Sequence, residues 1–323
     1  MMNPFLASGL FFLGLISCTS GQPNYSISPV QENGPAPTLS GKLVFHRYSC
    51  YSCNDSQLYL YDFTTKTLSS LSENWPITNA MNAHFSPNGQ QLVFMGMAQG
   101  SSNWDVFLYT FNAQTLPANL TSNSLGRDED PKFSPDGQKI IYKENGIVKE
   151  MTLQGTLLSA YSTLPSESSM PYYTTDGSAF LYAAQAPNDT ALNIYSYTLA
   201  TQQVRSLAVA PAVEEYYPIT KNATSFLYSR WYSATNPNDQ VYLGYFDGSV
   251  AKRLPFNESD ANFSDAYPIS DSLLVISSTK TGGKGGYDLY VVNAVSGKKW
   301  SLTNYTPYIN SAKEELGSTY FTP

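Results

Sequence analysis

The 323-residue chain has few charged residues, few histidines and three cysteines. Its 18 Lys and Arg against 25 Asp and Glu leave a formal charge of −7, so no basic surplus exists to neutralise nucleic-acid phosphates. We read the acidity mainly as a contribution to solubility. The two histidines, His46 and His84, are too few to build a catalytic metal site from several imidazoles.

Catalytic and phosphate-binding motifs are also missing. No Gly-x-Ser-x-Gly phrase marks a hydrolase nucleophile. The glycine-rich residues 282–286 come nearest to a phosphate loop, but they join two predicted strands and precede no helix, so we predict a flexible hairpin there. We therefore assign no catalytic residue from a motif.

Helical periodicity of useful length is absent, and a strand-type repeat takes its place. The phrase Phe-Ser-Pro-Asn-Gly occupies residues 85–89, and Phe-Ser-Pro-Asp-Gly occupies residues 133–137. Degenerate copies follow, and the chain ends on a truncated Phe-Thr-Pro. We take the first residue of each copy, an aromatic residue or Ile, as the mark of its register: Phe85, Phe133, Tyr173, Ile219, Ile269 and Phe321. By subtraction the marks are 40 to 52 residues apart, a period typical of a propeller or another repeat array.

Each copy continues in the same order. The Asn-Gly or Asp-Gly turn is followed by an apolar strand, then by a strand with alternating aromatic residues and then by a shorter fourth strand. Four strands per repeat predict an all-β, six-bladed β-propeller over residues 42–323. The first blade lacks its innermost strand, and we expect residues 318–321 to supply it, which would close the ring and remove exposed sheet edges.

This combination of phrase and following strands resembles the WD40-like repeats of TolB-like six-bladed propellers, over roughly residues 42 to 323. The resemblance implies the fold. It says little about function, because propellers serve binding, scaffolding and catalysis alike.

The N-terminus reads as a bacterial lipoprotein leader. Residues 10–16 form an apolar core too short to span a bilayer, and Leu-Ile-Ser-Cys at residues 15–18 fits a lipobox. We predict a signal peptide over residues 1–17, lipidation of Cys18 and a flexible tether over residues 18–41. The alternative is an ordinary secretory leader with an incidental cysteine. Lipidation would place the chain in the envelope, at an outer membrane facing the periplasm or the cell surface, and we expect a monomer.

Cys50 and Cys53 are the remaining cysteines. In an exported protein, such a close pair favours a local disulfide within a loop. A redox pair and two free thiols are the alternatives, and the redox role is disfavoured because no helix N-terminus is expected there to lower a thiol pKa.

The long connections are expected on one face of the propeller, where insertions usually carry function. Segments between blades bring acidic residues ahead of the inner strands: Asp128, Glu129, Asp130, Glu214, Glu215, Asp260, Asp265, Glu314 and Glu315. Other residues predicted on this face are Trp104, Trp231, Arg47 and Arg230. The acids would cap backbone amides, bind a divalent cation or basic peptide, or act as catalytic carboxylates. The aromatics would pack between blades or form a platform for a sugar or peptide.

We therefore predict a membrane-tethered, non-catalytic propeller that binds an envelope protein, peptide or glycan through its long-loop face. No cofactor is expected, apart from a divalent cation if the acidic residues at the channel mouth hold one. The alternative is a carbohydrate-active hydrolase or lyase with paired acids at the channel mouth.

Overall fold

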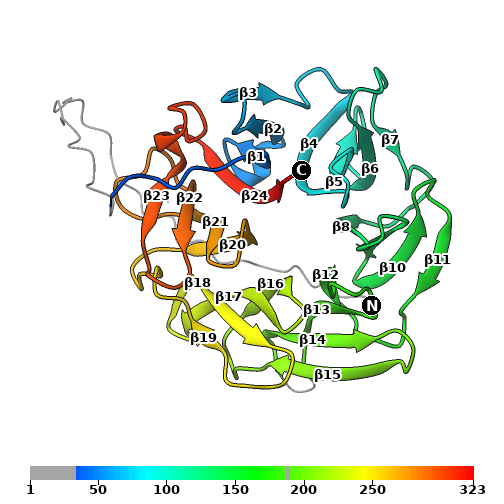
Figure 1. The fold of residues 1–323 in the computed structure, drawn as a ribbon. Helices are drawn as coiled ribbons and strands as arrows, with labels where there is room; N and C mark the ends of the chain where they lie inside the picture. The colour runs from blue at the N-terminus through cyan, green and yellow to red at the C-terminus, as the bar shows by residue number, and fades with distance from the viewer. Residues whose placement is uncertain (1–33, 187–188) are drawn as a thin grey trace, which may run out of the picture. The chain divides into compact units, whose positions relative to one another are not determined.

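The computed structural model describes residues 34–186 and 189–323, which form six four-stranded antiparallel sheets arranged in a ring (Figure 1). The six-bladed propeller is thereby confirmed. From the innermost strand outwards, blade 1 consists of β24 (Glu314–Phe321), β1 (Lys42–Tyr48), β2 (Gln57–Asp62) and β3 (Thr67–Ser70). Blade 2 consists of β4 (Ile77–Phe85), β5 (Gln91–Ala98), β6 (Asp105–Thr110) and β7 (Ala118–Asn119). Blade 3 consists of β8 (Asp128–Phe133), β9 (Lys139–Glu144), β10 (Ile147–Thr152) and β11 (Leu157–Ala160).

The other three blades follow the same order. Blade 4 consists of β12 (Ser169–Tyr173), β13 (Ala179–Gln185), β14 (Leu192–Thr198) and β15 (Gln203–Ala208). Blade 5 consists of β16 (Glu215–Asn222), β17 (Ser225–Ser233), β18 (Asn236–Tyr245) and β19 (Lys252–Arg253). Blade 6 consists of β20 (Phe263–Pro268), β21 (Leu273–Ser278), β22 (Asp288–Asn293) and β23 (Lys299–Ser301). Two short 3-10 helices are η1 (Tyr51–Cys53) and η2 (Leu302–Asn304).

The repeated phrase makes the hairpin between the first and second strands of a blade. In blade 3, the Ser134 hydroxyl donates to Asp136 (2.5 Å) and accepts from the Lys139 amide (2.9 Å). Gly137 follows with a φ of +69°, a left-handed conformation that glycine adopts at low cost. Ser134, Asp136 and Gly137 therefore hold the inner strand of blade 3 against its neighbour, and Ser86, Asn88 and Gly89 form the same turn in blade 2.

The expected register is correct in three blades and wrong by one residue in the other three. Phe85, Phe133 and Tyr173 lie opposite the second residue of the following strand, as assumed. In blades 5, 6 and 1 the equivalent residues are Thr220, Pro268 and Tyr320, whereas the sequence suggested Ile219, Ile269 and Phe321. The residues taken from the sequence as marks in these blades were chosen because they are hydrophobic, whereas the register is set by how the backbones of the two strands pair.

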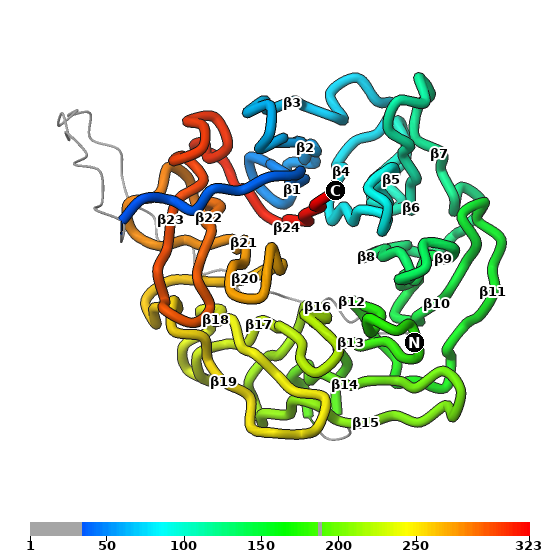
Figure 2. Tube along the Cα trace, viewed as in Figure 1, coloured from blue at the N-terminus to red at the C-terminus, as the bar shows by residue number. Residues whose placement is uncertain are grey.

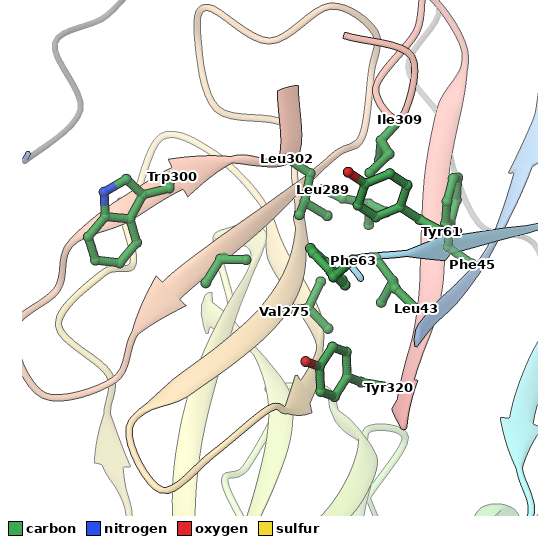
Figure 3. Packing of buried hydrophobic residues seen from close by; sticks show 11 residues of the cluster. Leu43, Phe45, Tyr61, Phe63, Val275, Leu289, Trp300, Leu302, Ile309 and Tyr320 are labelled. Atoms are coloured by element: carbon green, nitrogen blue, oxygen red, sulfur yellow. The ribbon is translucent and has the colours of Figure 1, made fainter. Parts of the chain in front are cut away.

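The ring closes as predicted, since β24 pairs with β1 and the last strand lies beside the first in Figure 2. Closure buries a cluster between blades 1 and 6 that includes Phe45, Tyr61, Val275 and Leu289 (Figure 3). Within blade 1, Arg47 of β1 binds Glu315 of β24 (2.7 Å) and donates to the carbonyl of Ile309 (2.5 Å). The first and last strands therefore form one blade by backbone pairing, packing and an ion pair.

Residues 34–41, the end of the expected tether, lie against this junction. Trp300 donates from Nε1 to the Gly34 carbonyl (3.1 Å), and Tyr305 donates to the Pro37 carbonyl (2.7 Å). The predicted signal peptide, Cys18 and the first part of the tether fall outside the described residues. Within the described part of the chain, no helix is long and apolar enough to cross a bilayer.

Each inner strand contains a bulge at the same position. The six residues Asn82, Asp130, Met170, Tyr217, Asp265 and Gly317 have φ between +51° and +60°. At each of them the pairing with the next strand skips a residue. A bulge redirects the side chains beside it, and these six residues line the axial channel.

Candidate functional site

The channel opens on the long-loop face into a cavity of about 380 Å³, which we call the mouth cavity. All six blades contribute to it. Its lining residues are His46, Tyr48, Tyr51, Met81, Asn82, Met95, Glu129, Asp130, Lys143, Met170, Tyr216, Tyr217, Asp239, Ser264, Asp265, Tyr287 and Leu316. The volume lies at the lower end of the range typical of small-ligand sites.

Asp130 and Asp265 occupy the bulge position on blades 3 and 6, which are opposite one another in the ring of six. Asn82 donates to Asp130 (3.0 Å), and the Gly317 amide donates to Asp265 (3.4 Å). Burial raises the pKa of Asp265 to about 6, and the negative charge of Asp130 adds to that shift. Both predicted ligand-face residues therefore line the cavity as electrostatically coupled carboxylates.

Asp239 also lines the mouth cavity, although it was not among the residues predicted from the sequence. It accepts a hydrogen bond from the Tyr216 hydroxyl. Burial raises its pKa to about 7, and Asp265 contributes to the rise. Asp239 belongs to the extended hairpin of β17 and β18, whose turn is residues 234–235. The β18 pairing with β17 is what carries Asp239 to the channel.

Five tyrosines surround these carboxylates: Tyr48, Tyr51, Tyr216, Tyr217 and Tyr287. Burial raises the pKa of Tyr217 and Tyr287, so their phenols stay protonated at neutral pH. Three methionines complete the apolar part of the wall. Tyrosine faces and carboxylates together form an environment that attracts an organic cation.

Lys132 and Lys143 place positive charge near the acids. Lys143 binds Glu129 (2.6 Å), which also binds Arg127 (2.6 Å), so Glu129 is already neutralised within blade 3. Lys132 lies deeper, where burial lowers its pKa while Asp130 and Asp265 oppose that shift. The carboxylates left for a ligand are therefore Asp130, Asp239 and Asp265, with the partly buried Lys132 beneath them.

Below the mouth cavity the channel narrows to a hollow of about 50 Å³. His84, Lys132, Tyr172 and Tyr267 line this constriction. His84 Nδ1 accepts from the Phe133 amide (3.1 Å), which leaves Nε2 to donate to the Tyr172 hydroxyl at 3.2 Å. Burial lowers the pKa of His84 to about 3, so the ring is neutral. Among the described residues, no three or more His, Cys, Asp or Glu are grouped as a metal ion requires.

Other predicted acids lie away from the channel. Asp128, Glu215 and Glu315 sit two residues before the bulge and are fully or almost fully buried. Glu215 lies 3.6 Å from Arg230, and Glu315 is paired with Arg47. The acids of this group, like Glu129, Asp130, Asp265 and Glu314, are inside the inner strands, so their expected placement in loops ahead of those strands is wrong.

Glu214 and Glu314 fit the capping interpretation. Glu214 accepts from the Leu192 amide (2.8 Å), and Glu314 accepts from the Tyr287 amide (2.6 Å). Each carboxylate thus accepts a hydrogen bond from a backbone amide at the start of the third strand of the preceding blade, since Leu192 begins β14 and Tyr287 precedes β22. Asp260 is exposed.

The two tryptophans predicted on this face, Trp104 and Trp231, are outside the mouth cavity. Trp104 is buried against Met81 and Met95, with the Arg127 guanidinium 5.2 Å from its ring. Trp231 lies partly exposed on β17. Cys50 and Cys53 form a disulfide around η1, in the connection between β1 and β2.

A family model described as the TolB beta propeller domain matches residues 30–266. The chain belongs to this family. A search of curated proteins found no match. Among solved structures, the chain resembles TolB from Acinetobacter baumannii (15% identity, TM-score 0.65, covering 88% of this chain and 67% of that one).

Two further structures share the fold. Hydrazine synthase from Kuenenia stuttgartiensis is 12% identical with a TM-score of 0.69, covering 87% of this chain and 46% of that one. The propeller domain of the Trilobed protease from Pyrococcus furiosus is 11% identical with a TM-score of 0.53, covering 82% of each chain. At these identities the likeness establishes the fold alone.

Proposed function

We propose that this chain is a non-catalytic binding propeller of the cell envelope whose mouth cavity takes a cationic group. The observation that carries the proposal is the grouping of Asp130, Asp239 and Asp265 among five tyrosines in one cavity of about 380 Å³. A Lys or Arg side chain of a protein or peptide partner has the matching chemistry, because its charge pairs with carboxylates and its stem packs on aromatic faces.

The experiment compares two matched ligands. A short acetylated peptide with a central arginine should bind the purified chain, and the same peptide with citrulline should bind at least tenfold more weakly. Asp265→Asn and Asp239→Asn should each weaken arginine-peptide binding, whereas Asp271→Asn, at an exposed position in the turn before β21, should not. Equal calorimetric affinities for the two peptides would contradict the proposal.

The envelope location rests on the leader and on the family. We propose that residues 1–17 are removed and that Cys18 carries the lipid, with the propeller acting as a monomer at the outer membrane. Cys18→Ser should move the protein from the membrane fraction to the soluble periplasmic fraction or the medium. Unchanged membrane fractionation of that variant would refute lipidation.

The raised pKa values of Asp239 and Asp265, about 7 and about 6, favour a second candidate. A carboxyl that titrates near neutrality can donate a proton, as a carbohydrate-active enzyme requires of its general acid. Release of reducing ends or unsaturated products from envelope polysaccharides, lost in Asp239→Asn, would support this candidate over pure binding.

A further inference from the structure

The channel has a second chamber at its other end. It has a volume of about 350 Å³ and lies where the hairpin turns of the repeated phrase converge, beyond the constriction. His84, Tyr172 and Tyr267 belong to both the constriction and this chamber, so they form its floor. We call it the turn-face chamber.

The turn-face chamber differs from the mouth cavity in charge. Of the sixteen described residues that line it, none is Asp, Glu, Lys or Arg. His84 is neutral because burial lowers its pKa. A charged ligand would lose hydration there and gain no counter-charge, which is unfavourable.

The floor is nevertheless polar. The Tyr172 hydroxyl accepts from His84 Nε2 (3.2 Å), and a hydroxyl has one donor and two acceptor sites in total. The Tyr267 hydroxyl also lines the chamber and accepts from Tyr172 and Thr319, so its own O–H is the donor left for a ligand. A purely apolar ligand would offer this O–H no acceptor. The ligand must therefore carry oxygen atoms of its own.

The walls are mostly apolar or already hydrogen bonded. Pro87, Pro135 and Phe321 present carbon surface. The hydroxyls of Ser86 and Ser134 donate within their own turns, to Asn88 (2.8 Å) and Asp136 (2.5 Å). The chamber thus combines carbon walls with a small polar floor and ends at the constriction, so it suits a compact group better than an extended chain.

Hydroxyl groups on a compact ring with exposed C–H faces meet all of these conditions. We propose that the turn-face chamber binds a neutral sugar residue, independently of the mouth cavity.

Saturation-transfer NMR on the full chain tests this with glucose, galactose and N-acetylglucosamine as probes. At least one should give saturation transfer, while glucosamine and glucuronate, which carry a charge, should bind at least tenfold more weakly. Thr175→Trp places a large side chain at the exposed rim and should abolish the signal, and Tyr267→Phe should weaken it. Asp239→Asn, in the mouth cavity, should leave it unchanged.

Melting curves identify variants that fail to fold. Because Thr175 is exposed, that variant is expected to melt like the parent. The proposal is overturned if none of the three neutral sugars gives a signal, or if Thr175→Trp binds as the parent does. A signal lost only in Asp239→Asn would also overturn it, because the sugar would then lie at the mouth.

Discussion

The role of each acidic side chain depends on its distance from the bulge. Asp128 and Asp130 are two residues apart on β8, a spacing that places side chains on the same face of a regular strand. The left-handed conformation of Asp130 breaks that alternation, so Asp130 lines the channel and Asp128 is buried beside it. In the same way, Asp265 lies at the bulge of its own strand, whereas the capping and ion-paired acids of neighbouring blades lie before theirs.

Asp128 provides a pH-dependent prediction at the residue scale. Burial raises its pKa to about 7 in the folded chain, above its ordinary value. The stability that comes from keeping it protonated is present below the ordinary pKa and is lost as pH rises through 7. Asp128→Asn should therefore raise the melting temperature by several degrees at pH 8 and change it little at pH 4. The exposed variant Asp271→Asn should show no such difference, and an equal effect at both pH values would contradict the assignment.

Lys132 is expected to act as a built-in cation beneath Asp130 and Asp265. Replacing it with methionine removes the positive charge that both carboxylates face. We expect Lys132→Met to melt at a lower temperature than the parent and to recover part of the loss in millimolar calcium, because calcium prefers carboxylate oxygens. The parent should not respond to calcium. A parent that calcium stabilises would instead support a divalent cation in the mouth cavity.

At the scale of elements, the bulges of the inner strands build the channel. Gly317 supplies the bulge in β24, with a φ of +60°, and a Cβ there would meet the His46 ring. Gly317→Ala should therefore lower the melting temperature by several degrees. Gly100 is the matched control, since it also has a positive φ, of +84°, but open space around it. Equal losses for the two variants would mean that backbone strain alone, and not packing at the bulge, sets the cost.

The closing strand is the second element with a measurable role. Deleting residues 318–323 removes half of β24 and exposes the edge of β1 in blade 1. We expect a lower melting temperature or aggregation, because an unpaired edge strand is a template for pairing with other chains. Deleting only residues 322–323, which follow the strand, should have little effect. A chain lacking residues 318–323 that melts like the parent would refute closure by this strand.

For the whole molecule, the blades and their closure could be predicted because a short turn phrase specifies each hairpin and recurs at a regular interval. The register of Thr220, Pro268 and Tyr320 could not, because a polar residue, a proline and a tyrosine share no sequence signal and are aligned only by strand pairing. Asp130 and Asp265 were found from their proximity to the inner strands. Asp239 was missed because its position depends on an extended hairpin two strands away from the axis.

The pH dependence of ligand binding tests the central claim most directly. Asp239 and Asp265 have pKa values of about 7 and about 6, so both are ionised at pH 8 and mostly protonated at pH 5. A cation in the mouth cavity requires the ionised forms. Calorimetric titration with the arginine peptide should therefore give an affinity at least tenfold weaker at pH 5 than at pH 8. The same affinity at both pH values, or no binding at pH 8, would contradict a cation-binding mouth cavity.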